Sequence, residues 1–196
     1  MTRTRSEYRL SPVTVEPPSA ERVTRRVLDT DRDELAALML DAYRGTIDDE
    51  GEDLDDALTA VDRYLAGMEH EHSFVVTEDD RVVAMAFVTV VDGVHYVDPI
   101  VVAADRKRAG LGRDAVRMLL ESLGNAGVTE VGATITDGNT ASERLFLGLG
   151  FTRRGPWADR SSRSAPTAEL EDSTTDRANP GPAPDRSDRP ATSPTR

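Results

Sequence analysis

The sequence has no cysteine, and Lys107 is the only lysine among its 24 basic residues. Without cysteine there is no disulfide framework and no thiol chemistry, which fits a reducing compartment. No apolar run approaches the length needed to cross a membrane, and residues 1–18 lack the apolar core of a secretory signal. We therefore expect a cytoplasmic protein that does not act at a membrane.

Apolar residues are also scarce: they make up 38% of the chain, and the mean hydropathy is -0.47. The 36 acidic residues give a net charge of -12 and a pI near 4.7. The phosphate backbone of a nucleic acid binds a positively charged protein surface, so for this acidic chain we expect no nucleic-acid partner. The same charge permits a cationic substrate.

The length of 196 residues suits one domain with tails. Residues 1–20 are polar and contain three prolines, which predicts a flexible leader. Residues 21–157 carry the periodic apolar patterns and form the predicted domain. Residues 158–196 are rich in Ser, Pro, Thr, Asp and Arg and cannot bury enough apolar surface to offset their chain entropy, so we expect disorder there.

Within the domain, hydrophobic periodicity predicts a mixed α/β fold. A first strand is expected in residues 22–28, followed by helices that include residues 35–43 and 54–66. Three strands follow as a meander: 73–77, 81–91 and 94–102. A helix from residue 111, a strand at 128–136, a short helix ending near Gly150 and a last strand from Phe151 complete the pattern.

The most informative stretch is residues 100–113, in which a β-branched run is followed by Asp105-Arg106-Lys107-Arg108-Ala109-Gly110-Leu111-Gly112-Arg113. The unpaired N–H groups at a helix start favour anions, and glycine lets a ligand approach the backbone. A basic, glycine-containing turn before a helix therefore predicts a phosphate or pyrophosphate site. The alternative is a turn whose basic residues are only solvated.

Two other phosphate-binding motifs fit less well. Gly110-Leu111-Gly112-Arg113-Asp114-Ala115 matches a dinucleotide pattern, but the glycines do not follow the strand directly and the preceding meander argues against a parallel βαβ array. A Walker A loop is excluded because no Lys-Ser/Thr pair follows the second glycine.

The order of elements, together with two motifs, resembles the Gcn5-related N-acetyltransferase (GNAT) superfamily over roughly residues 22–157. Lys107-Arg108-Ala109-Gly110-Leu111-Gly112 is similar to its phosphate loop, Gln/Arg-x-x-Gly-x-Gly/Ala. Asn139-x-x-Ser142-x-x-Leu145-Phe146-x-x-x-Gly150-Phe151 is similar to its later motif, Asn-x-x-Ala-x-x-Leu-Tyr-x-x-x-Gly-Phe. The resemblance implies a central, mostly antiparallel sheet, flanked by helices and splayed where acetyl-CoA binds as acyl donor.

The resemblance also implies a set of cofactor-binding residues. The pantetheine arm would pair with the backbone of the strand that contains Ile100, Val101 and Val102. Asn139 would reach the pantetheine or the phosphates, and Phe146 belongs to the same motif. The pyrophosphate would be held by N–H groups from seven consecutive residues: Lys107, Arg108, Ala109, Gly110, Leu111, Gly112 and Arg113.

Some positions depart from the family pattern. Lys107 replaces Gln or Arg and keeps the charge without the planar fork. Phe146 stands where many members have a tyrosine that protonates the departing thiolate, which Phe cannot do. Members also usually end in a long strand after Gly-Phe, whereas residues 152–157 form only a short segment before the polar tail. We therefore expect that the closing strand is either absent or supplied by a partner.

A protonated amine must lose a proton before it attacks a thioester. In the family the base often lies on the strand before the phosphate loop, which points to Asp98 and Tyr96 on one face of that strand. His95 lies on the opposite face of a regular strand, and a bulge near Pro99 would change that. The alternative is that Asp98 caps a bend before Pro99.

The acidic run from Asp48 to Asp56 lies where the resemblance places part of the acceptor site. We expect Asp48, Asp49 and Glu50, with Tyr43 nearby, to bind a cationic acceptor; the alternatives are a solvated loop and a core tyrosine. Residues 69–72, Glu-His-Glu-His, do not converge on one ion, so no metal site is expected.

Together these features predict an acyl-CoA-dependent N-acetyltransferase that acts on a primary amine of a small cationic molecule or of a protein. The alternative is a catalytically weak acetyl-CoA-binding regulatory or partner module, which Phe146 would permit. The sequence leaves open a homodimer and does not identify the acceptor.

Overall fold

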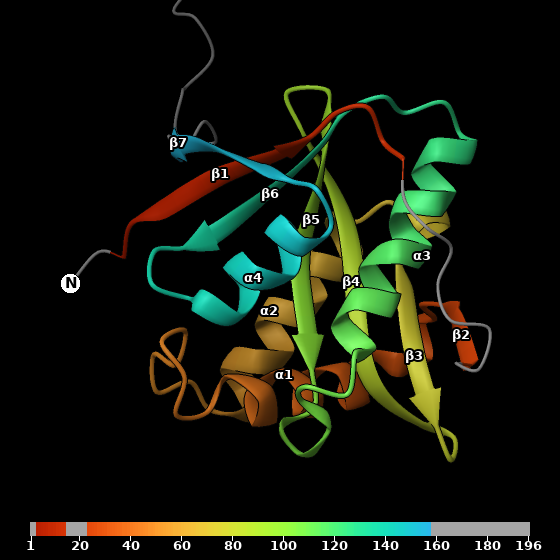
Figure 1. The fold of residues 1–196 in the computed structure, drawn as a ribbon. Helices are drawn as coiled ribbons and strands as arrows, with labels where there is room; N and C mark the ends of the chain where they lie inside the picture. The colour runs from red at the N-terminus through yellow and green to blue at the C-terminus, as the bar shows by residue number, and fades with distance from the viewer. Residues whose placement is uncertain (1–2, 15–22, 158–196) are drawn as a thin grey trace, which may run out of the picture. The chain divides into compact units, whose positions relative to one another are not determined.

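The structure is a computed structural model that describes residues 3–14 and 23–157. Seven strands in this part of the chain form one sheet in the order β2-β3-β4-β5-β6-β1-β7 (Figure 1). The predicted tail, 158–196, lies outside the described residues. No helix of the described ranges is long and apolar enough to cross a membrane.

The central strands are β3 (Phe74–Glu78), β4 (Arg81–Val91) and β5 (Val94–Val102), and they form the predicted antiparallel meander. β2 (Val23–Arg26) pairs with β3 at one edge. β6 (Val131–Thr136) is parallel to β5, whereas all other neighbouring strands are antiparallel. The prediction of a mixed, mostly antiparallel sheet is confirmed.

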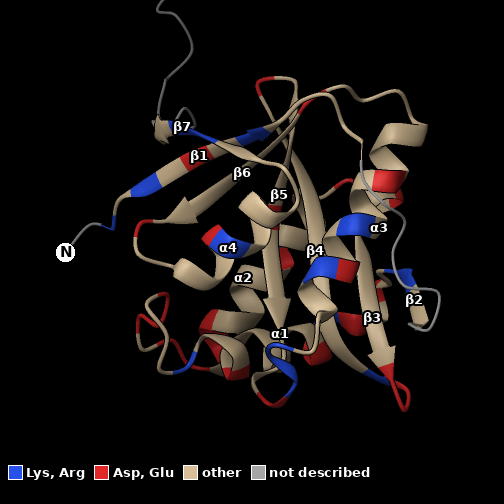
Figure 2. Cartoon of the chain, viewed as in Figure 1, with Lys and Arg blue, Asp and Glu red and all other residues tan. Residues whose placement is uncertain are grey.

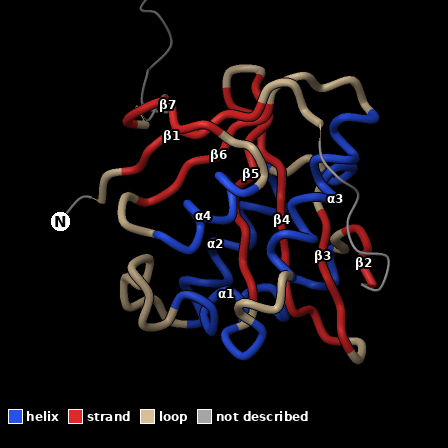
Figure 3. The backbone as a smooth tube through the Cα atoms, in the orientation of Figure 1, coloured by secondary structure: helices blue, strands red, loops and turns tan. Residues whose placement is uncertain are grey.

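Helices cover both faces of the sheet, as the tube in Figure 3 also shows. α1 (Arg32–Tyr43) and α2 (Leu54–Gly67) enclose one core cluster, which includes Phe87 of β4. α3 (Leu111–Asn125) and α4 (Thr140–Gly148) enclose the other. Three short 3-10 turns, η1 (Asp29–Asp31), η2 (His70–His72) and η3 (Ala104–Arg106), connect elements.

The prediction of a flexible leader over residues 1–20 is wrong for Arg5–Leu10, which form strand β1. β1 lies between β6 and β7 (Thr152–Pro156) and is antiparallel to both. Tyr8 and Leu10 enter the core, while Arg9 on the opposite face pairs with Glu7 and Glu130. The polar composition that suggested a leader therefore belongs to a face that is covered by ion pairs.

β7 resolves the question of the closing strand, because it is formed by this chain after Gly150-Phe151. Its partner in the sheet is β1, so residues from the N-terminal part of the chain complete this side of the sheet. The backbone N–H of Trp157 also donates to the carbonyl of Arg5, at 2.7 Å.

The sheet splays between β5 and β6, as predicted. These strands pair only from His95 with Val131 to Val97 with Ala133, although both continue further. On the other side of β5, the register with β4 shifts between Ala86 and Val88. The second half of β5 is thus paired to β4 while its edge toward β6 is open.

Candidate functional site

The turn between β5 and α3 presents a helix start to solvent. Arg108 and Gly110 have positive φ angles of 68° and 84°, and α3 begins at Leu111. A side-chain carbon added at Gly110 would meet no atom within 4 Å, so the turn faces open space. The first N–H groups of α3 have no carbonyl one turn before them and carry partial positive charge. An anion can therefore approach them.

The basic side chains of this turn fall into two groups. Nζ of Lys107 donates to the carbonyl of Ala42 at 2.7 Å, in the last turn of α1, and Arg106 pairs with Glu78 and Asp105. Arg108 and Arg113 are exposed and form no recorded ion pair with a described residue. Figure 2 shows this basic cluster on the loop that joins β5 to α3. Lys107 thus contributes its backbone to the turn, while its side chain ties the turn to α1.

Gly112 sets the distance between α3 and the strand. A Cβ at this position would lie 3.3 Å from Cγ2 of Val102, 3.5 Å from Cδ1 of Ile100 and 3.7 Å from Leu145 of α4. The absence of a side chain lets the helix start pack closely on the open half of β5. The predicted pantetheine residues and the predicted pyrophosphate residues are therefore adjacent.

The open half of β5 offers backbone groups on one side. Ile100, Val101 and Val102 pair with Ala86, Met85 and Ala84 of β4, and β6 has already diverged at this level. An extended, amide-containing arm can pair with a free strand edge in the same way as another strand does. These residues fit a pantetheine arm whose pyrophosphate lies at the start of α3.

Phe146 of α4 is only 2% exposed and packs edge-to-face on Phe151, with ring centroids 5.0 Å apart. Its position is that of a core residue. A contact between Phe146 and the cofactor stays a prediction.

Asn139 caps α4, and its side-chain oxygen accepts a hydrogen bond from the N–H of Ser142. Its Nδ2 donates to Oδ2 of Asp48 at 2.7 Å. A Cβ on the neighbouring Gly138 would lie 3.2 Å from Cδ1 of Ile47. The loop after α1 therefore reaches across to the turn between β6 and α4.

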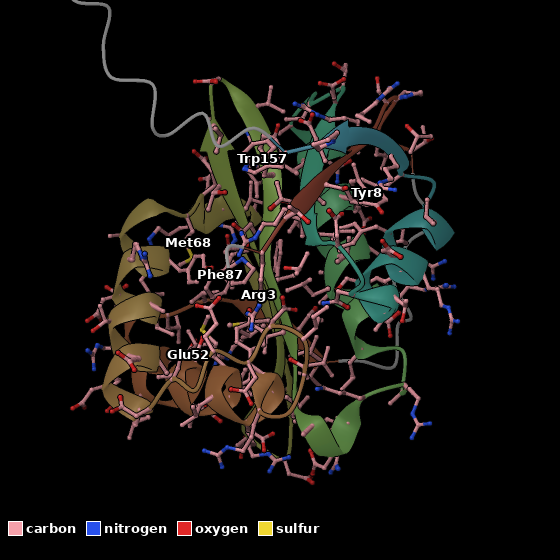
Figure 4. All side chains as sticks on the ribbon, turned by 90° about the vertical axis from the view of Figure 1, so that its left-hand side faces the viewer. Arg3, Tyr8, Glu52, Met68, Phe87 and Trp157 are labelled. Atoms are coloured by element: carbon pink, nitrogen blue, oxygen red, sulfur yellow. The ribbon has the colours of Figure 1, made fainter. Side chains whose placement is uncertain are left out.

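In the acidic loop, residues 45–53, the carboxylates predicted to bind an acceptor are already bonded to other groups of the protein. Asp48 is bound to Asn139, and Asp49 accepts from the N–H groups of Gly45 and Gly51. Glu50 pairs with Arg3, which also donates to the carbonyl of Asp49. In Figure 4 Arg3 lies beside this loop, which also carries Glu52. The carboxylates thus shape the loop before any acceptor arrives.

A pocket that opens to solvent lies between α1, the acidic loop and α2. Met39, Leu40 and Ala57 give it an apolar floor, and Tyr43 forms part of its wall. Its three carboxylates, from Asp49, Glu52 and Asp56, bond to backbone N–H groups of the loop and of the start of α2.

Asp98 lies on the α1–α2 side of the splay and is half-buried. Burial raises the pKa of its carboxyl, which the positive charge of Arg5 partly opposes. No hydrogen bond from a described residue reaches the Asp98 side chain. The carboxylate is enclosed but unpaired, as a group that receives a proton needs to be.

Two tyrosines lie close enough to Asp98 for its charge to act on them. Burial raises the pKa of Tyr64 and of Tyr43, and the negative charge of Asp98 raises both further. Both phenols are half-buried, and neither is hydrogen-bonded to a described residue. Sequence reasoning named Tyr43 but missed Tyr64, whose position on α2 looks like part of an ordinary apolar stripe.

Tyr96, the second predicted catalytic residue, lies in a different environment. Its hydroxyl donates to Glu7 at 2.6 Å, and the guanidinium of Arg9 both donates to it and stacks 4.9 Å from its ring centroid. The ring packs edge-to-face on Trp157 and would overlap any side chain at Gly132. The two predicted catalytic residues therefore differ in their contacts. The Asp98 side chain accepts no hydrogen bond from a described residue, whereas Tyr96 joins β1 to β5.

No group of three or more potential metal ligands occurs within residues 3–14 and 23–157. The Glu-His-Glu-His run around η2 is spread out: Nδ1 of His72 contacts the hydroxyl of Ser122 at 2.8 Å, and its ring meets His95 edge-on.

Comparison with known proteins identifies the same architecture. The model of the acetyltransferase (GNAT) family matches residues 32–151. A search of curated proteins finds no significant match.

Three solved structures illustrate the likeness. A GCN5-related N-acetyltransferase from Sphaerobacter thermophilus has a TM-score of 0.60 and 15% identity, covering 79% of this chain and 49% of that one. A protein assigned to the GNAT family from Novosphingobium aromaticivorans has a TM-score of 0.58 and 20% identity, covering 79% and 61%. A ribosomal-protein-alanine N-acetyltransferase from Brucella melitensis has a TM-score of 0.52 and 22% identity, covering 66% and 84%. The chain covers less than two thirds of the first two proteins, and at these identities the likeness is one of fold.

Proposed function

The chain belongs to the acetyltransferase (GNAT) family, and from this premise we propose that it transfers an acetyl group from acetyl-CoA to a primary amine. The acceptor is a small molecule or a protein amino group. The observation that carries the proposal is the open half of β5 beside the exposed start of α3, which together accommodate an extended amide arm and a pyrophosphate.

The residues that would hold acetyl-CoA follow from this geometry. The backbone of Ile100, Val101 and Val102 pairs with the pantetheine arm, and the N–H groups from Lys107 to Arg113 bind the pyrophosphate. Arg108 and Arg113 add exposed positive charge. Acetyl-CoA supplies an activated thioester, so this chain has to orient it and remove a proton from the amine.

Asp98 is the proposed general base. Its carboxylate accepts a proton from the acceptor ammonium, directly or through one water, and the neutral amine attacks the thioester carbonyl. A raised pKa suits this task, because a base is most effective when its pKa approaches the working pH. Phe146 has no proton to give to the departing thiolate, so that proton comes from solvent. Tyr96 holds β1 in place and takes no part in proton transfer.

Isothermal titration with acetyl-CoA and CoA tests the cofactor site. We expect micromolar binding by the intact protein and its loss in Gly110→Asp, because a carboxylate at the helix start repels the pyrophosphate. Gly127→Asp is the matched control: Gly127 also has a positive φ, 82°, also faces open space, and lies beyond the other end of α3. No binding by the intact protein, or equal losses in both variants, would contradict the assignment.

A catalytically weak acetyl-CoA-binding module is the second candidate, and Phe146 favours it. Release of free CoA thiol in the presence of a panel of primary amines distinguishes the two. Turnover with any amine supports the transferase, whereas tight CoA binding without thiol release supports the binding module.

A further inference from the structure

β1 runs past the α1–α2 side of the splay, where Asp98 lies, and carries the exposed cation Arg5. Its register with β6 is regular from Arg5 to Leu10, so Arg5, Glu7 and Arg9 share one face. Contacts fix where that face points: Glu7 and Arg9 meet Tyr96 of β5. Asp98 follows two residues after Tyr96 on the same strand.

Contacts of Arg3, two residues before Arg5, show what lies on the N-terminal side of Arg5. Arg3 contacts the acidic loop through Glu50 and the carbonyl of Asp49. Arg5 therefore lies along the chain between Arg3, which contacts the acidic loop, and Glu7, which contacts Tyr96. The positive charge of Arg5 lowers the pKa of Asp98, Tyr43 and Tyr64, which agrees with its place on β1 near these three side chains.

Arg5 differs from its neighbours because it has no partner among the described residues. Arg3 and Arg9 are both ion-paired, whereas Arg5 is exposed and makes no recorded hydrogen bond or ion pair. The acidic loop does not neutralise it, since Asp48, Asp49 and Glu50 are bound elsewhere. Among the described residues, Asp98 and Arg5 therefore provide one carboxylate and one guanidinium without a hydrogen-bond or ion-pair partner.

We propose that the acceptor carries an anionic group close to its primary amine, with Asp98 facing the amine and Arg5 binding the anion. This inference rests on the proposed function and narrows its acceptor to zwitterionic amines, such as an amino acid or an amino phosphate. It excludes simple polyamines as the preferred class. An acidic protein must also attract its substrate, and a local guanidinium lets an anion-bearing acceptor overcome the overall negative charge.

The reaction balances with this assignment. Asp98 takes one proton from the ammonium, the nitrogen forms a bond to the acetyl carbon, and the carbon–sulfur bond breaks. The thiolate leaves with the electron pair and is protonated by solvent, and a second nitrogen-bound proton is released as the amide forms. The anionic group does not react: Arg5 only positions it.

The test uses pairs of amines that differ only in the anion. Lysine against cadaverine and phenylalanine against phenethylamine test a carboxylate, and phosphoethanolamine against ethanolamine tests a phosphate. For the preferred pair we expect the kcat/KM ratio of anionic to non-anionic acceptor to fall by about 10- to 100-fold in Arg5→Gln, because a charge-assisted bond is lost. Arg5→Lys should keep part of the preference.

Arg26→Gln is the control for the change in net charge, since Arg26 is exposed on β2 at the far end of the sheet. Acetyl-CoA affinity should be the same in all variants, because Arg5 lies outside the cofactor residues. A ratio that does not change in Arg5→Gln, or a wild-type preference for cadaverine over lysine, would overturn the inference while leaving the transferase intact.

A binding measurement separates this inference from the proposed function. The same pairs are titrated into the CoA-loaded protein, where no transfer occurs. Binding that depends on the anion and on Arg5, without turnover in the acetyl-CoA assay, supports the inference and refutes the transferase. If no anionic acceptor binds or reacts better than its partner, the inference is wrong.

Discussion

At the residue scale, Asp98 shows a conflict between stability and function. Burial raises its pKa above that of the unfolded chain, so the folded state holds the proton more tightly than the unfolded state does. The stability that this group contributes is fully present below the unfolded pKa, near 4, and is lost as the pH rises through the folded pKa. At neutral pH the ionised carboxylate therefore lowers the free energy of unfolding.

Replacing Asp98 with Asn removes this destabilising effect together with the base. We expect Asp98→Asn to have a higher thermal midpoint than wild type at pH 7.5, with the difference shrinking toward pH 4. We also expect kcat to fall by about 10²- to 10⁴-fold, the usual effect of losing a general base. Thermal scans across pH and an acetyl-transfer assay measure the two effects. A lower midpoint at pH 7.5 would indicate instead that the carboxylate stabilises the bend before Pro99.

For some single residues, the sequence could not predict the contacts that decide their role. Strand alternation placed Asp98 and Tyr96 on one face, but it could not tell that Glu7 and Arg9 occupy the Tyr96 hydroxyl, because those partners come from a strand about 90 residues away. For the same reason Arg5 could not be recognised. Its importance arises only when β1 is placed beside the splay.

At the scale of elements, the turn from β5 into α3 was predictable, because the pattern changes within a few residues from β-branched to helical spacing and glycines mark the change. β1 was not predictable in this way. Only one face of Arg5–Leu10 is apolar, and its three inward side chains, Ser6, Tyr8 and Leu10, form a short and partly polar pattern. The charged residues of its opposite face suggest a solvent-exposed segment, and only the structure shows that Arg9 is ion-paired there.

The acidic loop gives a prediction at this scale. Asn139, which the family resemblance assigns to the cofactor, already bonds to Asp48. If the amide has to exchange this partner for acetyl-CoA, Asp48→Ala should tighten acetyl-CoA binding by about two- to tenfold, the value of one hydrogen bond. Asn139→Ala should weaken binding, and titration calorimetry measures both.

Removing a negative charge also favours an anionic ligand, so Asp55→Ala serves as the control. Asp55 is exposed in the first turn of α2 and makes no recorded contact with a described residue. Equal tightening by both substitutions would show a general charge effect, and weaker binding in Asp48→Ala would show that the bond to Asn139 prepares the site.

At the scale of the whole molecule, the sheet is assembled from both ends of the described chain. β1, near the beginning, separates β6 from β7, near the end, and contacts both. Both core clusters draw on residues between Tyr8 and Phe151. The fold should therefore depend on residues 5–10, contrary to what their polar composition suggests, whereas the composition of residues 158–196 predicts that the fold does not depend on them.

Two truncations test this dependence. Deleting residues 1–11 removes Tyr8 and Leu10, which are 2% and 6% exposed, and leaves Glu130 and Tyr96 without Arg9. Loss of each large buried side chain costs about 2–5 kcal/mol, which together approaches the whole stability of an ordinary domain. We expect this variant to lose its cooperative thermal transition, and deletion of residues 158–196 to shift the midpoint by no more than about 2 °C. A cooperative transition in the first variant would mean that β1 is dispensable, and a large shift in the second that residues after 157 pack on the domain.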